Sequence, residues 1–283
     1  LFLILLGLFC YGLSLEGFPQ AWKFIFYPNY ADFKPSAALE ALGLSFFTLS
    51  LGQGIMFTYG SYTKDSSDIP KIACIIAFVD IIISLLAALT IFPILFTFGL
   101  TPDAGPGLVF KTLPLVFSQM PGALLLSIAF FTLLVFTALT SSIALLEVVI
   151  AHAMERYHWS RKRAALTVSK IIGIVSIPCG LSNSGGLFPQ WQAIYGKNFF
   201  ETFNTLVSNW LLPLGGLATA LYIGWSADRN MILKEFCKGS KLAFICPLWH
   251  FSLRWVTPIA IFLLIFHKSQ LIDINFCINW LKF

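Results

Sequence analysis

The stretch that decides the fold is FTLSLGQGI, residues Phe47–Ile55, in which Gly52 and Gly54 enclose the polar Gln53. It lies in the middle of Leu42–Thr63, an otherwise apolar segment long enough to cross a membrane. Each glycine weakens a helix by about 1 kcal/mol relative to alanine. Non-helical backbone at membrane depth is tolerated only where it is buried in protein or lines a wet cavity. The stretch therefore predicts either a helix broken around a binding site or a notch for close helix packing, and Gln53 favours the broken helix.

The composition of the whole chain indicates a membrane setting. Of the 283 residues, 58% are apolar and 11% are charged, whereas soluble domains carry about 25% charged residues. A water-soluble fold of this length could not bury so much apolar surface. The net charge of +5 is too small, and too confined to a few loops, to indicate nucleic acid binding. We therefore expect an all-α integral membrane protein.

The cysteines and histidines give no sign of a metal or redox centre. The six cysteines occur without a CxxC or CxxCH pattern, and the four histidines are scattered without metal-ligand spacing. The sequence also lacks a Ser–His pair at helical spacing. Both a soluble enzyme and an intramembrane enzyme are therefore disfavoured.

The long apolar runs predict one partial and six full membrane helices. The run LFLILLGLFCYGL at Leu1–Leu13 is too short to span about 30 Å of hydrocarbon, and it lacks the flanks of a signal peptide. We expect it to be a helix cut in its middle, in the C-terminal part of a longer protein. The stretch after Lys268 is too short for a further crossing. The six full segments are Leu42–Thr63, Ile72–Leu100, Ala123–Met154, Ala164–Pro178, Phe199–Trp225 and Leu248–His267.

Lysines and arginines set the expected orientation. If Ala123–Met154 ends in the cytoplasm, ten basic residues lie in the inner loops and four in the outer loops. The cluster RYHWSRKR, residues 156–163, follows this helix directly and contributes most to the difference. Contact with anionic lipid is possible there, but a purely topogenic role is the simpler interpretation. The outer loop Thr101–Gly122 is rich in proline and glycine but also apolar, so we expect short helices that fold back onto the bundle as a lid.

Hydroxyl side chains gather in the segment FTALTSSIA, residues 136–144. On a helix, Thr137, Thr140 and Ser141 share one face. Oxygen ligands without nitrogen or sulfur suit a hard cation, sodium before any transition metal. The alternative is that small hydroxyl residues only allow close helix packing and hydrogen-bond to the preceding turn. Taken alone, these residues favour the packing alternative.

Two acidic residues lie inside apolar helices. Asp80 is nine residues into its segment, and Glu147 lies eight residues before Glu155 at the inner end. Acids at membrane depth usually face a partner or a water-filled path. Asp80 therefore favours a functional role, whereas Glu147 lies close enough to the inner end for water to reach it, which leaves both roles open.

Taken in order, these segments resemble the bacterial branch of the neurotransmitter:sodium symporter family. The resemblance is carried by FFTLSLGQGIMFTYGSY at residues 46–62, FTALTSSIALLE at 136–147 and the SRKRA loop at 160–164. It implies the LeuT fold, with inverted repeats and broken helices at the midplane. The implied architecture is one transmembrane helical domain over residues 1–283 that lacks the first four helices. Its parts would be a partial fifth helix (1–13), helices six to ten of the second inverted repeat (42–225) and an eleventh helix (248–267).

The resemblance also implies where substrate and sodium would bind. The free carbonyls of Phe47, Thr48 and Ser50 would face a substrate ammonium, which suits the negative end of a half-helix dipole, and Phe47 would close over the substrate. The residues implied to line the side-chain pocket are Gln53, Ser141 and Leu145. The implied sodium ligands are the Thr48 hydroxyl and Asp80 at the first site, and the Thr137 carbonyl with the Thr140 and Ser141 hydroxyls at the second.

Gates and an anion requirement follow from the same resemblance. Tyr62 and Glu155 match the inner gate of the family, with Glu147 nearby, and Glu201 is the candidate for the acidic outer gate. Chloride-dependent relatives use a bound anion beside the first sodium. Because Asp80 could supply that negative charge, we expect no chloride requirement.

The leading hypothesis is therefore part of a sodium-coupled symporter that moves amino acids into the cell by alternating access, located in the cell membrane. Its first helix, which would donate half of the sodium ligands, is expected to belong to N-terminal helices of the same or a companion chain. The alternative is a transport-incompetent truncated or split subunit with a structural, partner-dependent role.

Overall fold

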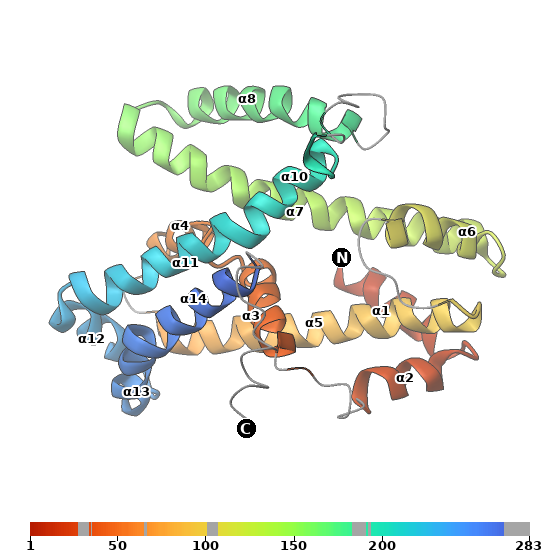
Figure 1. Ribbon diagram of the computed structural model, residues 1–283, viewed down its shortest axis with the longest axis horizontal. Coiled ribbons are helices and arrows are strands. Elements are labelled where there is room, and N and C mark those ends of the chain that lie inside the picture. Colours follow the sequence, from red (N-terminus) through yellow and green to blue (C-terminus); the bar gives the residue numbers. More distant parts are fainter. Residues whose placement is uncertain are drawn as a thin grey trace. The chain divides into compact units, whose positions relative to one another are not determined.

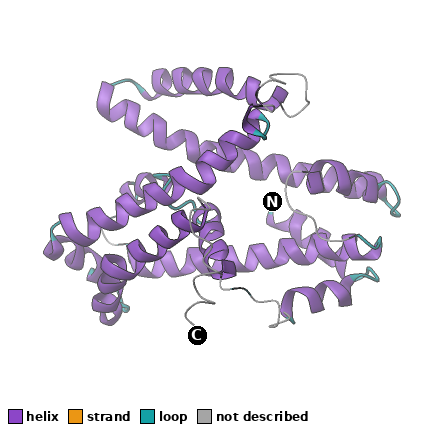
Figure 2. Ribbon diagram, viewed as in Figure 1, coloured by secondary structure: helices purple, strands orange, loops and turns teal. Residues whose placement is uncertain are grey.

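The structure is a computed structural model that describes residues 1–27, 34, 36–64, 67–100, 107–182, 191 and 194–268. Within these residues every regular element is a helix (Figure 2). In the described part of the chain, five helices are long and apolar enough to cross a membrane, and a bent pair at the start would make a sixth. The predicted all-α membrane fold is confirmed. The chain divides into two compact units, Leu1–Phe33 with Ala77–Ile143 and Lys34–Ile76 with Ala144–Phe283.

The first unit begins with a sharply bent helix pair. The pair is α1 (Phe2–Leu13) and α2 (Phe18–Phe26), with an angle of 110° between their axes. Gly17 lies at the corner, where its N–H donates to the Thr97 hydroxyl at 2.9 Å. A side chain at Gly17 would collide with the Pro93 carbonyl oxygen, so glycine is required by space. The remaining helices of this unit are α5 (Ile69–Thr97) from Ala77 onward, η2 (Leu108–Thr112), α6 (Leu113–Phe117) and α7 (Ala123–Tyr157) as far as Ile143.

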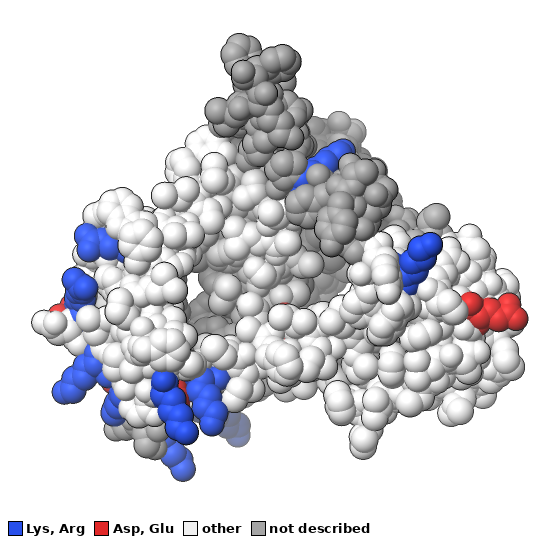
Figure 3. Space-filling model, turned by 90° about the horizontal axis from the view of Figure 1, so that it is seen from below, with Lys and Arg blue, Asp and Glu red and all other residues white. Residues whose placement is uncertain are grey.

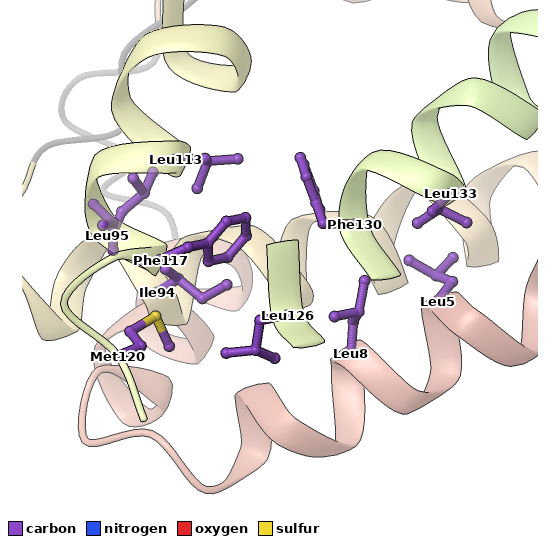
Figure 4. Packing of buried hydrophobic residues seen from close by; sticks show 11 residues of the cluster. Leu5, Leu8, Ile94, Leu95, Leu113, Phe117, Met120, Leu126, Phe130 and Leu133 are labelled. Atoms are coloured by element: carbon purple, nitrogen blue, oxygen red, sulfur yellow. The ribbon is translucent and has the colours of Figure 1, made fainter. Parts of the chain in front are cut away.

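The short helices η2 and α6 pack into the first unit's apolar core. Leu113 and Phe117 are fully buried there, and the Phe117 ring meets the Phe130 ring of α7 edge to face at 5.3 Å (Figure 4). Leu95 of α5 closes the same cluster (Figure 4). The prediction that this loop forms short helices folded back onto the bundle is confirmed for residues 107–122, and residues 101–106 lie outside the described part.

The second unit holds the interrupted segment and the last membrane spans (Figure 1). Its helix α3 packs against α11 and α14, and Phe46 of α3 is buried with Ile261 and Leu264 of α14. Besides the start of α5 as far as Ile76 and the end of α7, its elements are α3 (Ser36–Thr48), α4 (Ile55–Ser61), α8 (Arg161–Ser182), α10 (Phe199–Leu206), η3 (Val207–Leu211), α11 (Leu212–Leu221), η4 (Tyr222–Ser226), α12 (Arg229–Cys237), η5 (Ala243–Ile245), α13 (Cys246–Phe251), η6 (Ser252–Val256) and α14 (Thr257–Lys268).

Several membrane segments are longer than the sequence indicates. The segment expected at Ala164–Pro178 is the helix Arg161–Ser182, which continues through Pro178. Its start is fixed by Ser160, whose hydroxyl accepts the Arg163 N–H at 3.4 Å and whose carbonyl accepts the Ala164 N–H at 2.9 Å. A segment assigned by hydropathy alone leaves out the basic first turn, Arg161–Arg163, although the Ser160 cap makes this turn part of the helix.

Candidate functional site

The FTLSLGQGI stretch interrupts its helix. Helix α3 ends at Thr48 and α4 begins at Ile55, and between them Ser50, Gly52 and Gly54 adopt positive φ angles of 54°, 76° and 81°. The last turn of α3 closes through the Leu51 N–H, which donates to the Phe46 carbonyl at 2.8 Å. A run of left-handed residues cannot continue a right-handed helix. The predicted broken helix is therefore confirmed.

The break is also a site of close helix packing. A Cβ atom on Gly52 would collide with the Leu212 carbonyl oxygen and would lie 2.9 Å from the Gly216 nitrogen. In turn, a Cβ on Gly215 would collide with the Gly52 carbonyl oxygen. The helix is thus both interrupted and closely packed, because the interrupted segment rests on the glycine pair of α11, and a binding site at the break stays a prediction. Packing holds this backbone in its non-helical conformation.

Several carbonyl groups of the break accept no backbone hydrogen bond from the described residues. Within the described residues, neither the Thr48 nor the Ser50 carbonyl accepts a backbone hydrogen bond, whereas the Phe47 carbonyl accepts the Ser50 N–H at 3.2 Å. The expectation that all three carbonyls are free therefore needs correction at Phe47. The Phe47 and Thr48 side chains are exposed and Gln53 is half-buried. The Thr48 and Ser50 oxygens can accept hydrogen bonds from a cationic group.

Glu147 of α7 is the centre of a polar cluster in the second unit. Its carboxylate accepts hydrogen bonds from both terminal nitrogens of Arg161, at 3.0 and 2.7 Å, and from the Tyr62 hydroxyl at 2.9 Å. The Glu147 side chain is 10% exposed and that of Arg161 is 64% exposed. These charge-assisted hydrogen bonds replace the contacts with water that the buried carboxylate lacks. The cluster therefore connects α4, α7 and α8 through one anionic group.

Sequence reasoning assigned Arg161 only a topogenic role and missed this partnership. The signal for it was the acid itself, since an ionisable group inside an apolar helix requires a partner within reach. Arg161 is the first residue of the next helix, and the two helices form an antiparallel hairpin whose apolar contacts include Ala153 and Ala164. This hairpin carries the guanidinium back along α7 to Glu147.

A cavity of about 650 Å³ lies between α4 and the second half of α7. The predicted inner-gate residues Tyr62 and Glu155 both line it, so the structure brings them together at one cavity. The other lining residues are Gly54, Phe57, Thr58, Ser61, Val148, Ala151, His152 and Met154.

The hydroxyl face of α7 lies in the first unit. The Thr137 hydroxyl donates to the Leu133 carbonyl at 2.8 Å, and the Thr140 hydroxyl lies 2.9 Å from the Thr137 carbonyl and 3.1 Å from that of Phe136. These are the bonds to the preceding turn that the packing alternative requires. They do not oppose cation binding, because a hydroxyl that donates its proton to a carbonyl keeps its lone pairs available. The three hydroxyl residues of this face, Thr137, Thr140 and Ser141, are exposed.

The remaining predicted site residues lie apart from these clusters. Asp80 is half-buried in α5 of the first unit and makes no ion pair within the described residues, whereas Thr48 belongs to the second unit. Leu145 is exposed on α7. Glu201 has a local partner, since its carboxylate accepts the Asn198 N–H at 3.3 Å in a capping box at the start of α10. Their proposed roles at sodium, substrate and gate stay predictions.

Taken together, the apolar spans and the helix interrupted at membrane depth define a multi-pass membrane protein. Comparison with known proteins specifies it further. The chain matches the sodium:neurotransmitter symporter family over residues 1–276. It is 38% identical over 263 residues to the sodium-dependent transporter YhdH of Bacillus subtilis, and 34% identical over 264 residues to a sodium-dependent transporter of Haemophilus influenzae. These alignments cover 92% of this chain and 57% and 56% of the two relatives.

A solved structure gives the same result for the fold. The crystal structure of MhsT in complex with L-phenylalanine matches with a TM-score of 0.82 at 38% identity, covering 94% of this chain and 60% of that one. This chain therefore belongs to the sodium:neurotransmitter symporter family, whose members are secondary transporters rather than enzymes. Its fold is a partial LeuT-like fold, and it spans less than two thirds of the length of these relatives.

Proposed function

We propose that this chain is part of a sodium-coupled symporter that moves amino acids into the cell by alternating access. Sodium coupling is supported by the family and by the sodium-dependent transporters that the chain resembles. An amino-acid substrate is supported by the phenylalanine in the MhsT complex. The observation that carries the proposal is the break after α3, with its unpaired Thr48 and Ser50 carbonyls. The family match gives no support to the alternative of a transport-incompetent subunit.

The break suits the ammonium group of an amino acid. Helix α3 ends at Thr48, so the partial negative charge of its C-terminal end lies where the Thr48 and Ser50 carbonyls lack backbone partners. In the proposed site these oxygens accept the ammonium protons, and Gln53, Ser141 and Leu145 line the side-chain pocket. Phe47 covers the substrate from the outer side.

Two sodium ions travel with the substrate in this scheme. The first is held by the Thr48 hydroxyl and Asp80, and the second by the Thr137 carbonyl with the Thr140 and Ser141 hydroxyls. Hard oxygen donors of this kind suit an alkali cation. We propose that the remaining ligands come from helices encoded outside this sequence, as in a full-length member. Asp80 supplies a fixed negative charge, and transport then needs no chloride.

Linkage between ion and substrate explains how the gradient drives uptake. Sodium bound at sites that share Thr48 and Ser141 with the substrate pocket orders that pocket and so raises its affinity for the amino acid. The inner end is closed by Tyr62, Glu147 and Glu155 around the cavity beside α4, and Glu201 contributes to the outer gate. Reciprocal coupling makes release of both cargoes on the inner side favourable when internal sodium is low.

The direct test is amino-acid uptake into vesicles by the complete protein, measured against sodium concentration. The double variant Thr140→Ala with Ser141→Ala should raise the sodium concentration for half-maximal uptake at least about tenfold, since a lost charged hydrogen-bond or ligand contact is worth roughly one decade. The matched control is Ser176→Ala in α8, whose hydroxyl donates to the Gly173 carbonyl at 2.9 Å and which should behave as the parent. Uptake that is independent of sodium in the parent, or equal sodium dependence in parent and double variant, would contradict the proposal.

A further inference from the structure

A basic and aromatic cluster at the ends of two successive spans lies apart from the proposed transport site. The Arg254 guanidinium carbon lies 4.4 Å from the centre of the Trp225 ring, and the Trp225 indole N–H donates to the Arg254 carbonyl at 3.2 Å. The rings of Trp225 and Trp255 meet edge to face at 4.9 Å. All three residues belong to the second unit.

A glycine allows this arrangement. Gly224 is buried, and a Cβ atom at this position would lie 3.0 Å from the Arg254 Cα. The absence of a side chain therefore lets the spans Phe199–Ser226 and Ala243–Lys268 approach closely at this point. This close approach places the guanidinium over the Trp225 ring, where an attraction between the cation and the aromatic face holds it.

Arg254 has no anionic partner among the described residues. Within the described residues it forms no ion pair, and its Nε atom is buried without a hydrogen-bond partner. Arg161, by contrast, is satisfied by Glu147. Buried donors in folded proteins are almost always paired, and an arginine inside an apolar span requires a counter-charge. An anion from outside the described residues would supply this counter-charge.

The position of Arg254 places this anion at the membrane surface. Trp225 is the penultimate residue of the span Phe199–Ser226, so the guanidinium stacked on it lies near the end of that span. The Arg254 Cα itself belongs to the interior of the following span, Ala243–Lys268. Long basic side chains extend to the interface in this way, and tryptophan prefers the same depth. The orientation expected from the basic loops makes this the cytoplasmic side.

The surrounding charge favours an anionic ligand. Residues 225–256 contain five basic and two acidic side chains. The two acids are engaged locally, since Asp228 caps α12 by accepting the Asn230 N–H at 2.9 Å and Glu235 lies 3.8 Å from Lys238. On the face shown in Figure 3, white residues other than Lys, Arg, Asp and Glu cover most of the described surface. Basic groups beside a membrane span attract the anionic lipids of the inner leaflet.

We propose that Arg254, with Trp225 and Trp255, binds the phosphate of an anionic phospholipid in the cytoplasmic leaflet. The phosphate oxygens accept the guanidinium N–H groups, for which the planar arginine fork is suited. The two indole rings lie at headgroup depth in this arrangement, and exposed apolar residues of the span Ala243–Lys268, such as Phe251 and Ile259, offer surface to the acyl chains.

The test is lipid binding by the complete protein in phosphatidylcholine nanodiscs, titrated with phosphatidylglycerol and followed by native mass spectrometry. Arg254→Gln should weaken phosphatidylglycerol binding about tenfold. The matched control is Arg163→Gln, which also removes one positive charge. Arg163 is likewise stacked on a tryptophan, since its guanidinium carbon lies 5.0 Å from the Trp159 ring centre. This control should change binding by less than about twofold, as expected for an exposed charge.

Three results would overturn the proposal. The first is equal binding of phosphatidylglycerol and phosphatidylcholine by the parent protein, which needs no variant and so does not depend on the folding of Arg254→Gln. The second is an equal loss in the Arg254 and Arg163 variants, which would indicate general attraction alone. The third is displacement of the lipid by inorganic phosphate at equal concentration, which would indicate a site for free anions.

Discussion

The carboxylate of Glu147 accepts both terminal nitrogens of Arg161, at 3.0 and 2.7 Å, while the Tyr62 hydroxyl donates to the same carboxylate at 2.9 Å. Tyr62 immediately follows α4, the helix that resumes after the break. The buried acid therefore connects the interrupted segment to the hairpin of α7 and α8. Movement of α4 requires this connection to stretch or break.

Removal of either charge from this cluster should give unequal effects. Arg161→Gln leaves a buried carboxylate with only the Tyr62 hydroxyl, whereas Glu147→Gln leaves an exposed guanidinium that water can solvate. The melting temperature in detergent should therefore fall further for Arg161→Gln than for Glu147→Gln. The double variant should be more stable than Arg161→Gln alone, because the unpaired charge is gone. Equal and additive losses would show that the two side chains do not interact.

The backbone of the candidate site was largely predictable from sequence. Two glycines around Gln53, in a segment that must cross lipid, predict a break because both glycines destabilise a continuous helix. The surface of α11 against which the break packs was not predictable. It depends on contacts of Gly52 with Leu212 and Gly215, more than 150 residues away, and α11 offered only a proline and two glycines as a signal.

The pairing of Glu147 with Arg161 was not predicted for a different reason. Charge counting explains Arg161 fully as a topogenic residue, so the sequence presents no unexplained cation near the acid. Only the hairpin geometry, with Ser160 starting α8 directly after the turn, reveals that the first arginine of the helix reaches back to the carboxylate. The same limit applies to Asp80 and Thr48, whose proposed joint sodium site depends on residues of two units.

Substitution of Gly52 should destabilise the fold strongly. Gly52→Ala places a Cβ in the left-handed region at φ 76° and against the Leu212 carbonyl oxygen, so the loss should be at least about 2 kcal/mol. Gly60→Ala is the control, since Gly60 lies within α4 with no other atom within 4 Å of an added Cβ, and it should stabilise by up to about 1 kcal/mol. Unfolding in mixed micelles measures both. Tolerance of alanine at Gly52 would contradict the close packing on α11.

Chloride should have no effect on transport by the complete protein. If Asp80 supplies the fixed negative charge beside the first sodium, replacement of chloride by gluconate leaves the uptake rate unchanged. Asp80→Asn removes that charge and should reduce uptake at least about tenfold at limiting sodium. The control is Asp68→Asn, at the start of α5, whose carboxylate only accepts the Lys71 N–H at 3.1 Å. Loss of parent transport on removal of chloride would refute this role of Asp80.

The cavity beside α4 should be reachable from the cytoplasm. His152 and Ser61 line it from opposite helices, and α7 ends on the side that carries most basic loop residues. In a background without native cysteines, His152→Cys and Ser61→Cys should react with a membrane-impermeant thiol reagent in inside-out vesicles and not in right-side-out vesicles. Ser118→Cys, which follows α6 in the outer loop, should show the opposite preference. Reaction of His152→Cys from the outside alone would reverse the orientation, and reaction from neither side would mean that water does not enter the cavity.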